Sequence, residues 1–400
     1  MQSIAIIGGG PAGTAAAERL LKGAQESGQR IPEVLLFEER PGWEKPCGGG
    51  LTAKAVRRYP FLMDACQPHT QVEEAELVAA NGAAVRMRLR APLLVYSRSV
   101  LNGLLLKRAQ NAGARIIEDR ILGFEREGPG ERGWRLRGRT GAYFADYLIL
   151  AAGARSGLRK LLAPPVEAQD YMLTFGYFAP PAGRLLRVQF FEDFEGYAWA
   201  FPRPDHMALG IAGQMGESNM PGLRSRLHGF IERFGYPVKQ SPVFGHLLPA
   251  LGEASWQKLT LAGDGWAMVG DVGGLVDPLT GEGIYFAMRS GELSAEAILR
   301  GQPEEYPEKV WHEFGRRHES GARHATLFYH SDFWGKPVTT RMVEFCSGSG
   351  SFMNLLQDLF EGTQVYTGLP KRVYHLLARG MIEMAAGSAK SAMSGFFKAL

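Results

Sequence analysis

The sequence predicts an α/β fold in which a parallel sheet is combined with an antiparallel β-sheet and a helical C-terminal region. Three observations support this prediction. A short apolar run at the N-terminus ends in a glycine cluster, and a second apolar run ends in Gly270-Asp271. Between them lie many short runs rich in aromatic residues. Apolar runs that end in glycine-rich turns and precede helices are typical of parallel sheets, whereas successive short strands are typical of antiparallel ones.

The N-terminal glycine cluster has the G-x-G-x-x-G spacing of dinucleotide-binding loops. It follows a predicted buried strand over residues 3–7 and precedes a helix of small residues. Gly8 permits a sharp turn, Gly10 lets a pyrophosphate approach the backbone, and Gly13 lets the helix pack closely on the strand. Free N–H groups and the dipole at the helix N-terminus favour phosphates. The motif therefore predicts a dinucleotide site, and the alternative is a tight strand–helix turn without a ligand.

Two charged residues are placed to contact such a ligand. Glu38 ends a predicted strand over residues 34–37, where an acidic residue commonly hydrogen-bonds the ribose hydroxyls. The alternative for Glu38 is a solvated strand end. Ser97 is predicted to cap a helix whose first turn contains Arg98, and a cation is unfavourable there unless an anion is nearby. We therefore expect Arg98 to contact a cofactor phosphate, with a surface arginine as the alternative.

Cys47 is followed by three glycines, from Gly48 to Gly50. Successive glycines are unfavourable inside a helix or a strand, so they predict a loop that passes very close to something flat or bulky. Over a flavin ring, such a loop would let Cys47 face the reacting centre. The alternative is an inert buried cysteine, which is the interpretation we give to Cys66 and Cys346.

A second glycine-rich motif follows the apolar run over residues 266–269. Asp271 comes at the end of this predicted strand, where a carboxylate can hold sugar or ribitol hydroxyls. A helix is predicted to start near Gly281. Gly281 and Gly283 would let the helix N-terminus touch a flat ring, and its N–H groups would stabilise negative charge on a reduced flavin.

The middle of the chain predicts mostly strands. Residues 72–97 alternate with period two, residues 134–137 begin a predicted β-meander, and residues 147–150 predict a further strand of the parallel sheet. Four runs, at 171–178, 186–191, 197–201 and 207–211, predict one antiparallel sheet. Its aromatic side chains form either an ordinary core or the wall of a cavity for a hydrophobic substrate.

Composition limits the remaining possibilities. A chain of 400 residues predicts two or three domains. The net charge of +4 comes from scattered Lys and Arg residues, so we expect no nucleic-acid partner. Three cysteines and no predicted signal peptide predict a cytoplasmic protein. No run reaches about 18 apolar residues, so no membrane span is expected. Residues 301–400 predict helices with a break at 347–350. Residues 389–400 predict either a docked or frayed helix or, as the less favoured alternative, a contact with a membrane surface.

Together these motifs resemble the flavoprotein fold of p-hydroxybenzoate hydroxylase and, more closely within it, the geranylgeranyl reductase family. The general resemblance covers most of residues 1–300 and rests on segments 8–13, 152–159 and 270–271 and on Arg98. The specific resemblance rests on Lys45-Pro46-Cys47-Gly48-Gly49-Gly50, on Gly196-Tyr197-Ala198-Trp199-Ala200-Phe201-Pro202, and on Asp277-Pro278-Leu279-Thr280-Gly281-Glu282-Gly283-Ile284-Tyr285. Many members have an aspartate where this chain has Ala152.

The resemblance implies a Rossmann-like FAD-binding domain, a substrate domain and a helical C-terminal region. We expect the FAD-binding domain to comprise residues 1–70, 98–165 and 259–300. The substrate domain then comprises residues 71–97 and 166–258, and the helical region residues 301–400.

The resemblance also implies a set of site residues. FAD contacts are expected at Gly8, Gly10, Ala12, Gly13, Glu38, Arg98 and Asp271. Contacts beside the isoalloxazine are expected at Gly281, Gly283 and Ile284. Contacts near the flavin face are expected at Cys47 and Gly48, and the Ile121 backbone is expected beside the adenine. Tyr197 and Trp199 are expected to line the substrate cavity and, with Cys47, to form the candidate catalytic set. No metal is expected.

The implied activity is an FAD-dependent saturation of isolated C=C bonds in a geranylgeranyl-type prenyl chain, by hydride transfer from reduced flavin. Cys47 is the candidate group facing the alkene, as a proton relay or as a positioning contact. One complete dinucleotide fingerprint is found, so the electron donor is expected to be transiently bound NAD(P)H or a redox protein. Two alternatives remain. The first is a monooxygenase or halogenase acting on a hydrophobic or aromatic substrate, since residues 197–202 resemble a halogenase motif. The second is a non-catalytic flavoprotein that relays electrons to a partner.

Overall fold

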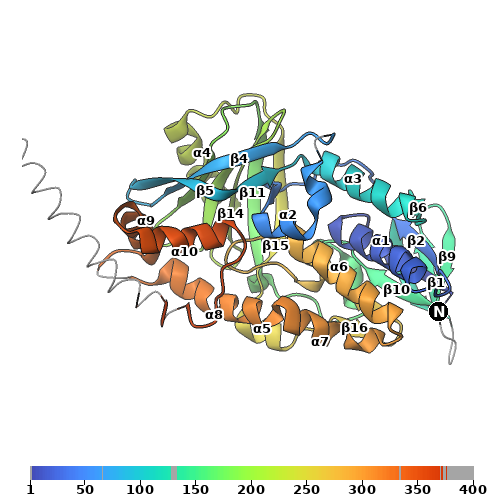
Figure 1. The fold of residues 1–400 in the computed structure, drawn as a ribbon. Helices are drawn as coiled ribbons and strands as arrows, with labels where there is room; N and C mark the ends of the chain where they lie inside the picture. Colours follow the sequence, from blue (N-terminus) through green and yellow to red (C-terminus); the bar gives the residue numbers. More distant parts are fainter. Residues whose placement is uncertain are drawn as a thin grey trace, which may run out of the picture.

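The computed structural model describes residues 2–64, 66–127, 133–332, 335–369, 371–372 and 375. It contains a six-stranded sheet, an eight-stranded sheet and a three-stranded sheet, with helices between and beside them (Figure 1). The C-terminal helices run along the lower and left parts of that view. The predicted α/β class with a helical C-terminal region is confirmed, and the predicted domain division stays a prediction.

The six-stranded sheet is the predicted parallel sheet, in the order β16-β17-β10-β1-β2-β6. Its strands are β1 (Ser3–Ile7), β2 (Glu33–Phe37), β6 (Arg115–Ile117), β10 (Tyr147–Leu150), β17 (Trp266–Met268) and the antiparallel edge strand β16 (Ala262–Gly263). Ile7 is in register with Phe37 of β2 and with Leu150 of β10. The loops after these strands therefore meet at one edge of the sheet, where ligands bind in folds of this kind.

Alternate residues of β1 pack against different layers. Ile4 and Ile6 belong to the core under the helices, whereas Ala5 and Ile7 belong to the core under the three-stranded sheet. The helices are α1 (Pro11–Glu26), α3 (Arg98–Asn111) and α6 (Ile284–Leu299), and the small sheet contains β7 (Ile121–Arg126), β8 (Trp134–Gly138) and β9 (Ala142–Ala145). Burial on both faces explains why the sequence of β1 is apolar without alternation.

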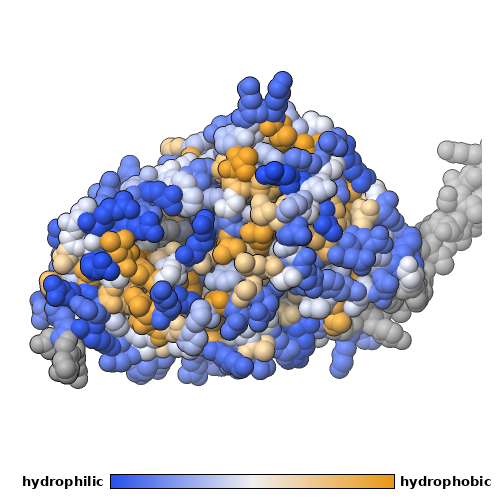
Figure 2. Space-filling model, turned by 180° about the vertical axis from the view of Figure 1, so that it is seen from behind, coloured by the Kyte–Doolittle hydropathy of each residue, from blue (hydrophilic) through white to orange (hydrophobic). Residues whose placement is uncertain are grey.

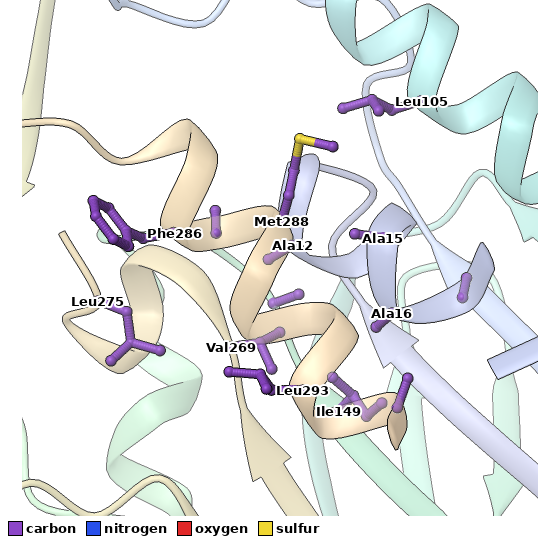
Figure 3. Close-up of a cluster of buried hydrophobic side chains, with 14 of the residues drawn as sticks. Ala12, Ala15, Ala16, Leu105, Ile149, Val269, Leu275, Phe286, Met288 and Leu293 are labelled. Carbon is purple, nitrogen blue, oxygen red and sulfur yellow. The ribbon is translucent and has the colours of Figure 1, made fainter. Parts of the chain in front are cut away.

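Small residues bring α1 close to β1 and to α6. A Cβ atom on Gly13 would lie 2.0 Å from the Gly8 carbonyl oxygen, and one on Gly291 would lie 2.2 Å from the Ala12 carbonyl oxygen. Figure 3 shows Ala12 and Ala15 of α1 next to Met288 of α6. The predicted role of Gly13 in close packing is confirmed.

The eight-stranded sheet has the order β15-β11-β14-β13-β12-β4-β5-β3. Its strands are β3 (Gly50–Leu51), β4 (Thr70–Val78), β5 (Ala84–Val95), β11 (Tyr171–Ala179), β12 (Leu186–Phe190), β13 (Gly196–Pro202), β14 (Met207–Gln214) and β15 (Val243–Pro249). The four predicted strands of the middle region lie next to one another in antiparallel pairs. The sheet is not purely antiparallel, because β12 pairs in parallel with β4 and so joins the two segments of the predicted substrate domain.

The two faces of β13 have different environments. Ala198 and Ala200 belong to the core formed with α4 (Met220–Phe234). Tyr197, Trp199 and Phe201 alternate with these alanines and therefore point to the opposite face. Small side chains on one face and aromatic ones on the other are what a strand between a packed helix and a cavity requires.

The helical C-terminal region is confirmed for the part that the structure describes. This region contains α7 (Tyr306–Val310), α8 (Arg316–His330), α9 (Val338–Gly348) and α10 (Gly350–Phe360). The short helices α2 (Ala53–Arg58) and α5 (Glu253–Gln257) lie earlier in the chain. Ser349 accepts a hydrogen bond at the start of α10, which confirms the predicted break. Helix α10 is tied to β5 by Arg90, which pairs with Asp358 at 2.6 Å and Glu361 at 2.8 Å. Residues 389–400 lie outside the described residues.

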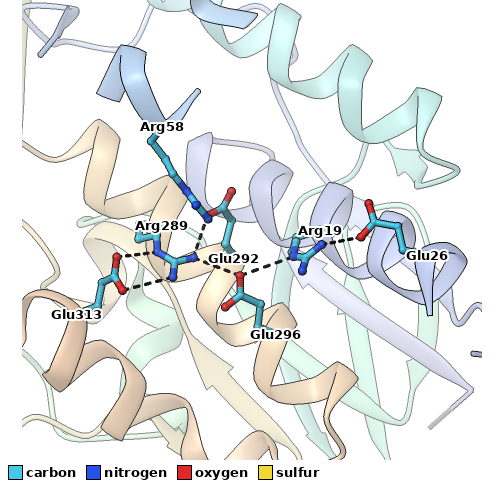
Figure 4. Close-up of polar contacts among 7 residues, drawn as sticks. All are labelled: Arg19, Glu26, Arg58, Arg289, Glu292, Glu296 and Glu313. Atoms are coloured by element: carbon cyan, nitrogen blue, oxygen red, sulfur yellow. Dashed lines mark hydrogen bonds and ion pairs between the residues drawn. The ribbon is translucent and has the colours of Figure 1, made fainter. Parts of the chain in front are cut away.

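The outer face of α6 carries a network of ion pairs (Figure 4). Arg289 pairs with Glu292, Glu296 and Glu313, at distances of 3.0 to 3.3 Å. Glu292 also pairs with Arg58 of α2 at 2.8 Å, and Glu296 with Arg19 of α1 at 3.6 Å. The network links α6 to α1, to α2 and to the helical segment Trp311–Gly315 that carries Glu313.

The surface is mostly hydrophilic on the face drawn in Figure 2, with apolar patches between the polar groups. Among the described helices, none has the length and apolarity that crossing a bilayer demands.

Four predictions about local structure are wrong. Helix α6 begins at Ile284 instead of near Gly281, because Gly281 is left-handed at φ +69°. The β-meander begins at Ile121, before residues 134–137. Ser97 occupies the cap position of α3, but its hydroxyl donates to Asp205 at 3.3 Å, so it does not cap the helix. Cys66 is exposed, whereas Cys346 is buried as expected.

Candidate active site

A cavity of about 1430 Å³ lies between the carboxyl edge of the parallel sheet and the aromatic face of the eight-stranded sheet. Its lining includes all the predicted cofactor residues except Gly13, together with Tyr197 and Trp199. Pockets for one small molecule usually measure roughly 300–1,000 Å³. The cavity therefore has room for a large cofactor and part of a second ligand.

The glycine loop forms one wall. Gly8 has φ +113°, and its N–H donates to the Phe37 carbonyl at 2.9 Å. A Cβ atom on Gly10 would meet nothing within 4 Å, so this backbone opens onto free space. Gly10 is also the cap residue of α1, and no side chain of the described residues accepts from the first N–H groups of that helix. Free N–H groups at a helix start beside an open space are suited to a pyrophosphate.

Glu38 lies beside this loop at the end of β2. Its carboxylate accepts hydrogen bonds from the N–H groups of Gly9 and Arg40, both at 2.9 Å. Glu38 therefore braces the glycine loop, a role that its position in the sequence did not reveal. It also lines the cavity, as a ribose contact requires, and that contact stays a prediction.

Arg98 lies in the first turn of α3 and is 3% exposed. Its Nη2 atom donates to Asn102 at 3.2 Å, and its buried Nε atom has no hydrogen-bond partner among the described residues. An unpartnered buried guanidinium nitrogen on a cavity wall needs an acceptor. A cofactor phosphate would supply one, as the sequence predicts.

Glu44 and Arg203 hold the Cys47 loop, and neither was identified from the sequence. Glu44 pairs with Arg203, whose side chain is 0% exposed and whose Nη2 atom donates to the Cys47 carbonyl at 2.5 Å. Glu44 also accepts from the N–H groups of Arg98 at 2.8 Å and Ser99 at 3.0 Å, so it replaces Ser97 as the cap of α3. Burial opposes ionisation, but Arg203 and these donors lower the pKa of Glu44. The pair thus links the Cys47 loop to the helix that carries Arg98.

The glycines after Cys47 pack against protein groups. Cβ atoms on Gly48 and Gly50 would lie 3.2 Å and 2.6 Å from the Phe201 ring, and one on Gly49 would lie 2.1 Å from the Tyr96 carbonyl oxygen. The sequence predicted that this glycine loop passes close to something flat or bulky, and the Phe201 ring is part of that surface. The Gly49 N–H donates to the Cys47 sulfur at 3.3 Å, and Cys47 lines the cavity.

Asp271 also lines the cavity, from the 3-10 turn Gly270–Gly273 that follows β17. It pairs with Lys45 at 2.8 Å, and this cation lowers the pKa of the Asp271 carboxyl although burial opposes ionisation. His246 faces the same pair from β15. Burial and the Lys45 charge lower the pKa of His246, so its ring is neutral at pH 7, and its buried Nε2 atom has no partner among the described residues. The roles of Lys45 and His246 were not identified from the sequence, because neither forms a recognisable spacing with its partners.

The remaining predicted cofactor residues also line the cavity. They are Ala12, Ile121, Gly281, Gly283 and Ile284. A Cβ atom on Gly281 would lie 3.0 Å from the Tyr197 hydroxyl, so this loop passes directly beside the aromatic wall.

One end of the cavity is apolar, and we call it the apolar lobe. Its lining residues belong to a single hydrophobic cluster or pack against it: Leu77, Leu93, Val188, Phe190, Tyr197, Phe201, Leu279, Phe328, Tyr329, Met342, Leu359 and Phe360. Trp199 contacts Tyr197, with ring centroids 6.0 Å apart. Strands β5, β12 and β13 and helices α8 to α10 supply most of these side chains, so the C-terminal helices close the lobe.

These features fit FAD. The open glycine backbone and the unpartnered Arg98 Nε atom suit its pyrophosphate, and the unpartnered His246 Nε2 atom suits a polar edge of its ring system. The predicted residues are brought together as expected from the sequence, apart from Gly13, which packs α1 on β1. Individual FAD contacts stay predictions.

Comparison with known proteins agrees with this assignment. Residues 62–253 match the family model described as FAD dependent oxidoreductase. Geranylgeranyl diphosphate reductase of Arabidopsis thaliana is 28% identical over 334 residues, an alignment that covers 74% of this chain and 66% of the relative. Digeranylgeranylglycerophospholipid reductase of Methanosphaerula palustris is 29% identical over 317 residues, covering 74% of this chain and 76% of the relative. The chain thus spans slightly less than two thirds of the plant relative.

Solved structures show the same fold. A geranylgeranyl bacteriochlorophyll reductase-like protein from Thermoplasma acidophilum superposes with a TM-score of 0.75 at 21% identity, covering 92% of this chain and 98% of that one. A flavin-dependent brominase superposes with a TM-score of 0.68 at 17% identity, covering 94% and 99%. The predicted resemblance to the geranylgeranyl reductases is confirmed, and the family model agrees with the predicted FAD-dependent oxidoreductase.

Proposed function

We propose that this FAD-dependent oxidoreductase, which is similar to the geranylgeranyl reductases, saturates isolated C=C bonds of a prenyl chain by hydride transfer from its reduced flavin. The observation that carries the proposal is the apolar lobe, which lies in the same cavity as the predicted flavin-site residues and includes Tyr197 in its lining. A long hydrocarbon chain is the kind of ligand that such a lining binds.

The residues of the site would act mainly by positioning. An isolated alkene has no oxygen to polarise, so its alignment with the reacting centre must supply much of the catalysis. Tyr197, Trp199 and Phe201 present aromatic side chains on one face of β13, and the C-terminal helices add further apolar side chains to the lining. Arg203 and Glu44 fix the loop that carries Cys47.

Several finer points belong to the same proposal. The substrate is a hydrophobic prenyl lipid, and the electron donor is NAD(P)H or a redox protein that binds transiently. The protein works in the cytoplasm, in contact with a membrane surface when it takes up lipid. The names of the sequence relatives support a prenyl substrate.

The second candidate is an oxygen-using halogenase or hydroxylase. It is favoured by residues 197–202 of β13, which resemble a halogenase motif, and by the fold shared with the brominase. At 17% identity that likeness concerns the fold alone.

The two candidates differ in what reoxidises the flavin. FAD-loaded protein is photoreduced without oxygen and mixed with geranylgeranyl diphosphate, and flavin absorbance is followed. The reductase proposal predicts reoxidation by the lipid alone. If the flavin stays reduced until oxygen is admitted, and the lipid then accelerates oxygen consumption, the halogenase or hydroxylase candidate is favoured instead.

A further inference from the structure

The proposed reduction requires a proton as well as a hydride, and any inference about the source of that proton rests on the proposed function. For each bond reduced, the hydride forms one C–H bond, the alkene π bond breaks, and a proton forms the second C–H bond. Reduced FAD accounts for the hydride and both electrons. The second C–H bond needs an acid in a lobe whose lining is mostly apolar.

Two tyrosine hydroxyl groups of the lobe already donate hydrogen bonds to backbone carbonyl oxygens. The Tyr197 hydroxyl donates to the Thr280 carbonyl oxygen at 2.5 Å, and the Tyr329 hydroxyl donates to the Leu279 carbonyl oxygen at 3.2 Å. Burial raises the pKa of both phenols well above the ordinary value. They shape the loop before α6 and are poor proton donors.

Glu282 lies in that same loop and lines the cavity. Its Oε1 atom accepts a hydrogen bond from the Thr52 hydroxyl at 2.8 Å, and the Thr52 oxygen in turn accepts from the Ala55 N–H at 3.4 Å. Because the Thr52 hydrogen is directed at Oε1, a proton held by the carboxyl belongs on Oε2. Among the described residues, no hydrogen-bond partner is found for Oε2.

Gly362 leaves space beside this carboxyl. A Cβ atom on Gly362 would lie 2.8 Å from the Thr52 hydroxyl oxygen and 3.3 Å from Glu282 Oε2. Gly362 also has φ +73°, a conformation that favours glycine. The backbone after α10 therefore passes close to Oε2 without covering it with a side chain.

The charges around Glu282 favour its neutral form. Burial raises its pKa, and the Asp277 carboxylate adds to this, whereas the Thr52 hydrogen bond, Arg317 and Lys54 oppose it. Arg317 of α8 is paired with Asp277 at 2.9 Å. The Lys54 ammonium of α2 lies 4.3 Å from the centre of the Tyr285 ring. Both cations thus have other partners, and burial prevails.

We propose that Glu282 is the acid of the apolar lobe. It holds a proton on Oε2, transfers it to the alkene carbon that does not receive the hydride, and recovers a proton from water. Cys47 is then a positioning contact on the same cavity.

The test compares E282Q with the matched control E296Q. The glutamine side chain of E282Q keeps the volume and an acceptor for Thr52 but cannot release a carboxyl proton. Glu296 lies on the outer face of α6, paired with Arg19 and Arg289 (Figure 4). Each variant is loaded with FAD, photoreduced anaerobically and mixed with geranylgeranyl diphosphate, and single-turnover flavin oxidation is recorded against pH.

We expect the wild-type rate to fall as pH rises through the raised pKa of Glu282. The E282Q rate should be lower by about 10²–10⁴-fold and should lose this pH dependence, as expected for removal of a general acid. E296Q should behave as wild type. Equal flavin absorbance per protein in all three shows that the cofactor site is intact.

A second readout does not depend on turnover. At pH 7, the infrared difference spectrum between FAD-loaded wild type and E282Q should contain the C=O band of a protonated carboxyl. The difference spectrum between wild type and E296Q should lack this band. A wild-type rate and pH profile in E282Q, or an ionised Glu282 at pH 7, would overturn the proposal. Failure of wild type itself to turn over would instead refute the proposed function, and the infrared band would still decide the state of Glu282.

Discussion

Replacing Glu44 by alanine tests the link between the Cys47 loop and α3. The change removes the partner of Arg203, a guanidinium whose side chain is 0% exposed. Among the described residues, Arg203 would keep two hydrogen-bond partners, the Cys47 carbonyl and the His206 ring, whose Nε2 lies 3.0 Å away. Leaving a buried charge without its partner costs about 3–5 kcal/mol, and losing a helix cap costs about 0.5–2 kcal/mol. We expect the free energy of unfolding to fall by about 3.5–7 kcal/mol.

Urea unfolding of the FAD-loaded protein measures this change. A matched control is Glu73→Ala, because Glu73 pairs with Arg88 at 3.4 Å on the surface, where the side chains are 64% and 79% exposed. That variant should lose about 0–1 kcal/mol. The reasoning is refuted if Glu44→Ala costs no more than Glu73→Ala.

The pH dependence of Glu44→Ala supplies a second check. The pKa of Glu44 is lowered in the folded protein, so its contribution is present above the pKa of the unfolded chain. That contribution is lost as pH falls through the lowered folded pKa. The stability difference between wild type and variant should therefore shrink on acidification. In the native state, the freed loop should also make Cys47 react faster with iodoacetamide, as measured by peptide mass mapping.

Three further outcomes are expected. Gly13→Ala should abolish FAD retention, since its Cβ would lie 2.0 Å from the Gly8 carbonyl oxygen, and a variant that purifies yellow would contradict this. Arg98→Leu should raise the FAD dissociation constant by roughly 10–100-fold, as for a lost charge-assisted hydrogen bond, and calorimetry showing unchanged affinity would exclude the phosphate contact. Phe360→Trp should shorten the apolar lobe, so that a geranyl chain is still reduced while a geranylgeranyl chain is reduced more slowly. Equal loss for both chains would mean that Phe360 does not set length.

Much of the fold could be predicted because local patterns determine it. The apolar β1 and the glycine loop need only neighbouring residues to be recognised, and the alternation in residues 197–201 separates the two faces of β13. The parallel β4–β12 pair could not be predicted, because it joins strands far apart in the sequence whose own patterns are equally compatible with antiparallel neighbours.

The candidate site divides in the same way. Gly8, Glu38, Arg98 and Asp271 are marked by their place after strands or at helix starts. Arg203 matters because it pairs with Glu44, and His246 because it interacts with the Lys45–Asp271 pair. These residues are far apart in the sequence, so no local sequence pattern predicts the interactions. The role of Phe201 as the surface under the Cys47 glycines is hidden for the same reason.

The most direct measurement of the central claim is the mass of the lipid product. FAD-loaded protein, reduced without oxygen, is incubated with geranylgeranyl diphosphate, and the mass of the extracted lipid is measured by mass spectrometry. Prenyl reduction predicts a gain of two hydrogens for each double bond saturated, with the flavin oxidised in proportion. An unchanged lipid mass, or a product carrying oxygen or halogen after air is admitted, would contradict it.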